Sequence, residues 1–201
     1  MENDKQLPEG DTMQCQSCNR QGWIEVIAGC MFAGKSEELI RRLSRLPYAK
    51  LKYQIFKPRL DDRDGAFVKS HDDNCLSGTT VDEAEDILAL VEEDTLVVGI
   101  DEAQFFGKDL IAVCEELANR GLRVIVAGLD TTFEAEPFEP MPGLMAVAER
   151  VTKVYAHCVN CGSPAYRSHR LTASKEKVVT GAKGEYEALC RNCFSELKLE
   201  K

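Results

Sequence analysis

The chain is organised around the stretch Gly29-Cys30-Met31-Phe32-Ala33-Gly34-Lys35-Ser36. It matches the pattern G-x-x-x-x-G-K-[ST], whose glycines let the backbone bend so that successive N–H groups converge on a phosphate. Lys35 offers a positive charge to the β- and γ-phosphates of a nucleotide, and the Ser36 hydroxyl is a ligand for Mg²⁺. The pattern therefore predicts a phosphate-binding loop, or P-loop, made of Gly29, Met31, Phe32, Ala33, Gly34, Lys35 and Ser36.

The residues on either side of this loop favour the same interpretation. An apolar run at 23–28 leads in as a strand should, and Leu39, Ile40, Leu43 and Leu46 follow at helical spacing. A strand, a glycine loop and a helix N-terminus together point backbone amides and the helix dipole at an anion. A plain glycine turn between two core elements is the alternative, and this context argues against it.

The rest of the chain alternates between strand and helix patterns. Strands are expected at 51–56, 95–100 and 122–128, and helices at 82–93, 106–120 and 141–148, with a long polar loop at 57–80. Alternation of this kind predicts βαβ units and an α/β fold with a parallel sheet. The composition changes near Val151, so we expect three parts: a flexible extension at 1–21, a P-loop domain at 22–150 and a small module at 151–201.

Composition and charge exclude some functions. The 201 residues are 44% hydrophobic and carry a formal charge of −9, which argues against a nucleic-acid partner because such partners favour basic surfaces. No apolar run is long enough to span a membrane, and the polar start of the chain lacks a signal peptide. We therefore expect a cytoplasmic protein with no membrane partner.

A second phosphate signal lies at 96–102. An apolar strand ending in Asp101-Glu102, downstream of a P-loop, is typical of the Walker B arrangement. Asp101 would hold Mg²⁺, and Glu102 is placed to accept a proton from an attacking nucleophile as general base. Asp61 and Arg63, in the polar loop, give weaker support as a metal neighbour and a phosphoryl-stabilising charge. These signals leave an ATPase, a nucleotide kinase and a GTPase all open.

Nine cysteines include three C-x-x-C pairs. Cys158/Cys161 and Cys190/Cys193 are 28 residues apart, and two such pairs can close a tetrahedral four-thiolate zinc site with no open position. We expect structural Zn²⁺ that fastens residues 162–189 as a loop. The pair Cys15/Cys18 has no partner pair, and free thiols in a tail are its expected state.

Together these motifs resemble the type II thymidine kinase family. The resemblance rests on Gly29–Ser36, on Asp101-Glu102-Ala103-Gln104-Phe105-Phe106, on Gly128–Phe138 and on the two cysteine pairs, in this order. It implies a RecA-like domain carrying a zinc-anchored lasso, and usually a homotetramer. It also implies transfer of the ATP γ-phosphoryl group to the 5′-hydroxyl of thymidine in nucleotide salvage, with dTTP as feedback inhibitor.

The resemblance also implies roles for individual residues. Glu102 would be the general base and Arg63 a catalytic arginine, with Asp61, Asp101 and Gln104 beside the ATP–Mg²⁺ unit. The nucleoside pocket would comprise Met31, Phe105, Leu129, Phe133 and Phe138, closed by the lasso residues Ser168, Val179, Gly181 and Tyr186. Cys30 departs from the family pattern, where proline is frequent, and Ser168 stands where threonine is common. Deoxyuridine is the competing acceptor, and the rival function is a P-loop ATPase or a zinc-ribbon binding protein with no nucleoside acceptor.

Overall fold

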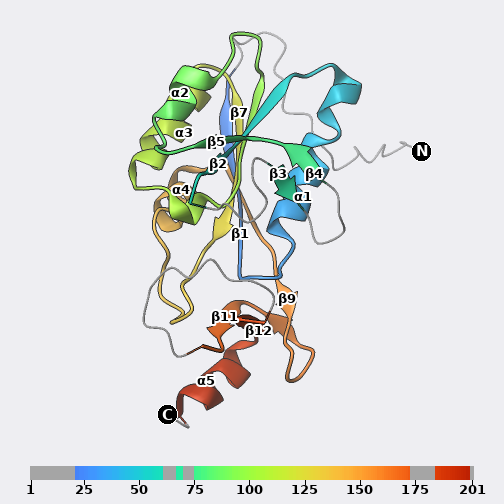
Figure 1. The fold of residues 1–201 in the computed structure, drawn as a ribbon, viewed down its shortest axis with the longest axis vertical. Coiled ribbons are helices and arrows are strands. Elements are labelled where there is room, and N and C mark those ends of the chain that lie inside the picture. Colours follow the sequence, from blue (N-terminus) through green and yellow to red (C-terminus); the bar gives the residue numbers. More distant parts are fainter. Residues whose placement is uncertain (1–20, 61–66, 70–74, 173–183, 200–201) are drawn as a thin grey trace, which may run out of the picture.

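The computed structural model describes residues 21–60, 67–69, 75–172 and 184–199. Figure 1 shows a large part built on a central sheet and a smaller part at its lower end, where the described chain finishes in a helix. The sheet contains β1 (Trp23–Gly29), β2 (Tyr53–Pro58), β5 (Thr79–Val81), β6 (Val97–Ile100), β7 (Arg123–Leu129) and β8 (Arg150–Lys153). Their order is β5-β2-β6-β7-β1-β8 and every neighbouring pair is parallel. The predicted parallel α/β fold is confirmed.

Helices cover both faces of this sheet (Figure 1). On one face, the core packs the strands against α2 (Asp86–Leu90), α3 (Asp109–Asn119) and α4 (Met141–Val147). On the other face, Leu39, Ile40 and Leu43 of α1 (Lys35–Leu43) pack on the sheet, close to the hairpin of β3 (Phe67–Lys69) and β4 (Cys75–Ser77). Because both faces are buried, the central strands are nearly continuous apolar runs. Among the described residues, this part also has two short 3₁₀ helices, Leu46–Ala49 and Ala103–Phe105.

The described residues of the smaller part form two antiparallel strand pairs and a helix. The pairs are β9 (Ala156–His157) with β10 (Pro164–Ala165) and β11 (Arg167–Arg170) with β12 (Tyr186–Leu189), followed by α5 (Arg191–Leu199). Its small core includes Ala156, Ala165, Leu189 and Phe194, but also Cys30 and Ala33 of the P-loop. The phosphate loop is therefore part of the packing of both parts of the chain.

Three expectations about elements need correction. The helix expected at 82–93 is only α2, 86–90, and the loop expected at 57–80 contains the short strands β3, β4 and β5. Three-residue strands are too short to show a period. No helix was expected after 148, but the structure has α5 at the end of the described chain. β8, at 150–153, spans the boundary expected at 150/151 and pairs with β1; the boundary itself stays a prediction.

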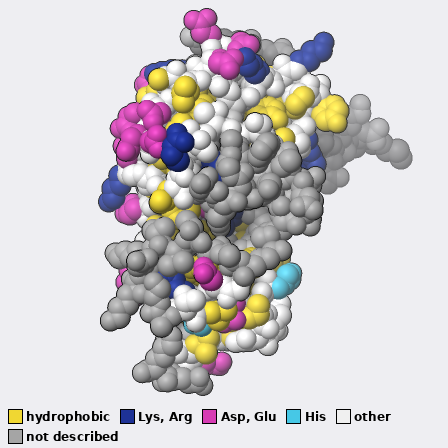
Figure 2. All heavy atoms as spheres, in the orientation of Figure 1, with side chains coloured by type: hydrophobic (Ala, Val, Ile, Leu, Met, Phe, Trp, Pro, Cys, Tyr) yellow, Lys and Arg dark blue, Asp and Glu magenta, His cyan; other side chains and the backbone are white. Residues whose placement is uncertain are grey.

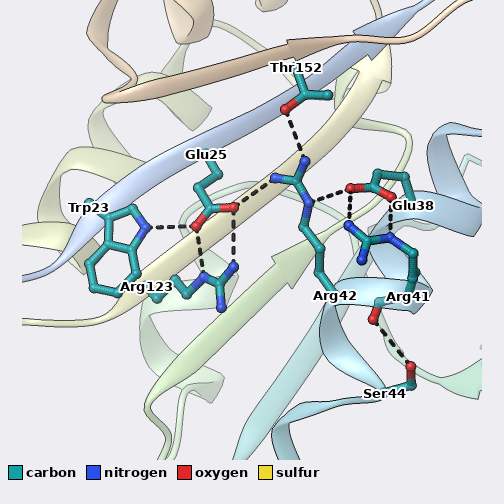
Figure 3. A network of polar contacts seen from close by, with 8 residues as sticks. All are labelled: Trp23, Glu25, Glu38, Arg41, Arg42, Ser44, Arg123 and Thr152. Carbon is teal, nitrogen blue, oxygen red and sulfur yellow. Dashed lines mark hydrogen bonds and ion pairs between the residues drawn. The ribbon is translucent and has the colours of Figure 1, made fainter. Parts of the chain in front are cut away.

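A buried carboxylate ties α1 to the sheet at the end opposite the P-loop (Figure 3). Glu25, in β1, is 2% exposed. Its two oxygens accept hydrogen bonds from Trp23 Nε1 at 2.7 Å, Arg123 Nε at 2.8 Å and Arg42 Nη1 at 2.7 Å. Arg42 also donates to Thr152 Oγ1 of β8 at 2.9 Å. One arginine of α1 thus joins the helix to two neighbouring strands.

The network continues along α1. Arg42 Nε donates to Glu38 Oε1 at 2.8 Å, and Arg41 binds both oxygens of Glu38. The hydrogen bonds of Arg41, only partly opposed by burial, hold the pKa of Glu38 at about 2. Burial would raise the pKa of Glu25, but Arg123, Trp23 and Arg42 outweigh it and the pKa is lowered. Both carboxylates therefore stay charged in the folded protein.

The surface in Figure 2 carries a concentration of acidic side chains over the region of α2 and α3. There the carboxylates of Glu83, Glu85 and Asp109 lie within 4.8 Å of one another.

Across the described ranges, the helices are all too short or too polar to cross a membrane.

Candidate active site

The P-loop connects β1 to α1. Gly34 has φ +76° and immediately precedes the helix, which is the left-handed conformation that glycine adopts at least cost. Gly29 is required for a different reason: a Cβ there would lie 2.4 Å from the carbonyl oxygen of Val154. Lys35 Nζ donates to the carbonyl oxygen of Cys30 at 2.9 Å, so the lysine is held across its own loop.

The acidic strand end lies directly beside this loop. Ser36 Oγ donates to Asp101 Oδ2 at 2.9 Å, joining the start of α1 to the end of β6. Burial, reinforced by the charge of Glu102, raises the pKa of Asp101 to about 7. A buried carboxylate in this state is stabilised by a cation. The donor set of a serine hydroxyl and a carboxylate consists of oxygens, which Mg²⁺ prefers.

Glu102 is held by the adjoining chain. It adopts φ +52°, an uncommon conformation for a residue with a side chain, and uncommon conformations of this kind concentrate at functional sites. Gln104 Nε2 donates to Glu102 Oε2, while Gln104 Oε1 accepts from the backbone N–H of Leu129 at 2.9 Å. Gln104, which we expected near ATP and Mg²⁺, thus links Glu102 to the end of β7. The sequence offered no signal for this link, because Leu129 is 25 residues away.

The apolar residues expected around a nucleoside follow or end strands at the same end of the sheet as the P-loop. Leu129 ends β7 and is the register partner of Gly29 in β1, which places it next to the P-loop. Phe105 follows β6, and Phe133 and Phe138 follow β7. These four side chains and Met31 are all half-buried. They provide apolar surface beside the phosphate site.

The smaller part reaches this edge through β11. The backbone N–H of Met31 donates to Ser168 Oγ at 3.0 Å, and Cys30 Sγ donates to the carbonyl oxygen of Ala165 at 3.2 Å. Burial raises the pKa of the Cys30 thiol, so it remains a protonated donor. Ser168 and Tyr186, both expected in the lasso, are buried here. The contact between Ser168 and the P-loop backbone was not foreseen from the sequence.

Several expected site residues lie outside the described residues. They are Asp61, Arg63, Val179 and Gly181, as well as Cys15 and Cys18 of the N-terminal pair.

The C-terminal cysteines form a candidate metal centre. The sulfur atoms of Cys158, Cys161, Cys190 and Cys193 all lie within 4.8 Å of one another, and Cys161 Sγ is 3.6 Å from Cys190 Sγ. Tetrahedral zinc with Zn–S bonds of about 2.3 Å requires sulfurs roughly 3.8 Å apart, so the cluster has the right size and chemistry.

Local hydrogen bonds shift the pKa values of two of these thiols in opposite directions. Burial would raise the pKa of Cys158, but the backbone N–H groups of Cys190, Cys161 and Asn160 outweigh it and lower the pKa to about 6. The pKa of Cys193 is raised, because its side-chain hydrogen bonds to Cys190 and Cys161 favour the protonated form. Four thiolates at this spacing would repel one another strongly without a positive ion between them.

Comparisons with known proteins identify the relatives of this chain. The sequence model of the thymidine kinase family, described as "Thymidine kinase", matches residues 22–194. A thymidine kinase of Rhodothermus sp. is 56% identical over 174 residues, covering 86% of this chain and 81% of the relative. Those of Bdellovibrio bacteriovorus and Bacteroides fragilis are 52% and 51% identical, covering 87% and 89% of this chain and 86% and 90% of the relatives. The chain therefore belongs to the thymidine kinase family.

Proposed function

We propose that the protein transfers the γ-phosphoryl group of ATP to the 5′-hydroxyl of thymidine, giving dTMP. The observation that carries the proposal is the convergence of Ser36, Asp101 and Glu102 beside the P-loop, with the Ser36–Asp101 contact at 2.9 Å. Relatives named thymidine kinase, about half identical over most of the chain, support the choice of acceptor. A bare ATPase or zinc-ribbon binding protein is not favoured by these comparisons.

Each group has a distinct task in this reaction. The P-loop amides and Lys35 would bind the β- and γ-phosphates, and Ser36 and Asp101 would hold Mg²⁺, which when bound neutralises phosphate charge. Glu102 would accept the proton of the 5′-hydroxyl, with Gln104 orienting its carboxylate. Arg63 and Asp61 would act at the phosphoryl group from the loop after β2. Phosphoryl transfer depends mainly on positioning and charge stabilisation, and this site contributes both.

The acceptor would lie between the two parts of the chain. Met31, Phe105, Leu129, Phe133 and Phe138 would surround the nucleoside from the sheet edge, and Ser168, Val179, Gly181 and Tyr186 would close over it. Water is then kept from the γ-phosphate, whose hydrolysis would waste ATP. Deoxyuridine lacks only a methyl group, so discrimination against it would be roughly 10- to 200-fold at most.

The decisive experiment measures ADP formation with thymidine, deoxyuridine, deoxycytidine or no nucleoside, in wild type and in Glu102→Gln. Thymidine should stimulate ADP formation in the wild type, and Glu102→Gln should lower kcat by about 10²- to 10⁴-fold while ATP still binds. ADP formation that ignores the nucleoside would refute the kinase proposal. Full activity in Glu102→Gln would refute only the assignment of the base.

The remaining expectations are proposals with separate tests. We propose structural Zn²⁺ at the four cysteines, and metal analysis should give one zinc per chain; a value clearly above one would implicate Cys15 and Cys18 as well. We also propose a homotetramer, inhibition by dTTP and a cytoplasmic location. Light scattering checks the assembly, inhibition kinetics check dTTP, and fractionation of cells checks the location.

A further inference from the structure

Arg170 is a buried cation to which the proposed reaction assigns no role. It ends β11 and is the register partner of Tyr186 in β12, so the two side chains emerge on the same face of this strand pair. Arg170 is only 5% exposed. Its Nε donates to Tyr186 Oη at 2.9 Å, and its guanidinium carbon lies 5.3 Å from the centre of the Tyr186 ring.

The same guanidinium also contacts an aromatic ring from the larger part. Its central carbon lies 3.8 Å from the centre of the Phe133 ring. Phe133 follows β7, in the segment that returns toward α4. At this distance the guanidinium makes a close cation–π contact with Phe133, an interaction that strengthens as water is excluded. One side chain therefore contacts two aromatic rings that come from different parts of the chain.

We propose that Arg170 is a positioning residue that fixes Phe133 and Tyr186 relative to each other as two walls of the acceptor pocket. The inference rests on the proposed function, in which both rings contact the nucleoside. A flat base needs walls at a set separation and angle, and a wall free to turn must be ordered each time the base binds. Arg170 would supply that order in advance. Substituting Arg170 should then weaken acceptor binding without changing ATP binding or the rate of phosphoryl transfer.

Arginine suits this position better than lysine. Its planar guanidinium lies against Phe133 while Nε–H, in the same plane, reaches the Tyr186 hydroxyl. A lysine ammonium keeps the charge but has neither the flat face nor a donor at that point of the side chain. Arg170→Lys thus removes the geometry and retains the cation, which separates positioning from simple charge.

A neighbouring residue supplies a matched control. His169 stands beside Arg170 in β11, and its ring contacts Glu187 of β12 at 2.8 Å. His169→Gln alters a cross-strand polar contact of the same two strands without touching Phe133 or Tyr186. Tyr186→Phe is a further variant, because it removes only the hydroxyl that Arg170 binds.

The test compares wild type, Arg170→Lys, Arg170→Met, Tyr186→Phe and His169→Gln. Thymidine binding by calorimetry, KM for thymidine and for ATP, kcat, zinc content and thermal unfolding are measured for each. We expect Arg170→Lys and Arg170→Met to weaken thymidine binding by at least tenfold, with KM for ATP unchanged and kcat within about threefold. Tyr186→Phe should weaken thymidine binding a few-fold, and His169→Gln should stay within about twofold of wild type.

The outcomes separate this inference from the proposed function. A wild type whose ADP formation ignores thymidine refutes the proposed function itself. If the wild type is active and Arg170→Lys binds thymidine as tightly as the wild type, the positioning role is overturned. It is also overturned if KM for ATP rises as much as KM for thymidine. If both Arg170 variants fail to fold, Tyr186→Phe decides: thymidine affinity equal to wild type overturns the inference.

Discussion

Two buried carboxylates, at opposite ends of the central sheet, have pKa values shifted in opposite directions. Glu25 near the start of β1 and Asp101 after β6 are 2% and 6% exposed. Glu25 is bound by two guanidinium groups and an indole N–H, and its pKa is lowered. Asp101 accepts from the Ser36 hydroxyl, stands next to Glu102, and has a pKa raised to about 7. Two carboxylates that are both buried therefore have pKa values shifted in opposite directions, because their partners differ.

The difference separates Glu25, which completes the fold, from Asp101, which we propose serves the reaction. Glu25 has its positive partners within the chain, so it needs nothing further and holds α1 against the sheet. When Asp101 is ionised its buried charge is unfavourable, and Mg²⁺ with ATP would relieve this, since a cation favours the charged carboxylate. Binding of Mg–ATP would therefore restore the stability that the buried charge of Asp101 costs.

The largest expected effect comes from Asp101→Asn. Asparagine keeps the shape and a hydrogen-bond acceptor for Ser36 but removes the charge proposed to hold Mg²⁺. We expect thymidine phosphorylation to fall about 10²- to 10³-fold, the range for loss of one electrostatic group at a reaction centre. A coupled assay of ADP release at saturating thymidine checks this, with circular dichroism as the control for folding. Activity within threefold of wild type would remove Asp101 from the metal site.

Glu25→Gln should lower the stability of the protein but leave its activity nearly unchanged. Arg42 and Arg123 would lose their anion, and breaking a buried ion pair costs about 3–5 kcal/mol; their partial exposure, 12% and 15%, reduces this to roughly 2–3 kcal/mol. Urea unfolding with and without Mg–ATP measures the loss. The kcat of the folded variant should stay within about threefold of wild type. A stable variant with low kcat would instead give Glu25 a role in the reaction.

The pH dependence of stability should distinguish the two carboxylates by sign. The folded pKa of Asp101 is raised, so the native state holds the extra proton between pH 4 and 7 and the contribution of Asp101 falls as pH rises through this window. The folded pKa values of Glu25 and Glu38 are lowered, so their contributions are present above about pH 4.3 and are lost as pH falls toward the folded values, about 2 for Glu38.

In the absence of ligand, Asp101→Asn should therefore be more stable than wild type by about 1–3 kcal/mol at pH 8, and the gap should close near pH 4. Urea unfolding across pH 4–8 provides the measurement. A gap independent of pH would mean that its origin is packing, not charge.

The smallest effect is expected at the outer end of the Glu25 network. The side chain of Arg41 is 50% exposed and pairs with Glu38 three residues earlier on α1. Arg41→Ala should cost only about 0.3–0.5 kcal/mol, the usual range for helix-surface ion pairs. Thermal unfolding at low and high salt measures it. A loss above 1.5 kcal/mol would show that Arg41 acts through the buried members of the network.

The same contrast explains what could be predicted from the sequence. The parallel sheet, the P-loop, the Asp101 strand end and the four-cysteine cluster depend on local patterns or fixed spacing, and they were predicted. Glu25 appeared only as one charge within an apolar strand, because Arg42 and Arg123 are 17 and 98 residues away. The Gln104–Leu129, Met31–Ser168 and Arg170–Phe133 contacts are equally non-local. They depend on how β7 and β11 are placed, which no single stretch of the sequence encodes.

The contacts of the P-loop with the smaller part limit how freely this enzyme can be recombined. A domain that folds and functions as an exchangeable module shares few contacts with its neighbour. Here Gly29 lies against the backbone of Val154, and the Cys30 thiol is matched to one carbonyl group of β10. A chimera that takes its four-cysteine part from one relative and its P-loop from another would pair surfaces whose side chains do not match. Residues 29–33 and the described residues of 154–172 and 184–194 therefore pack as one unit, although more than a hundred residues separate the two segments in the chain.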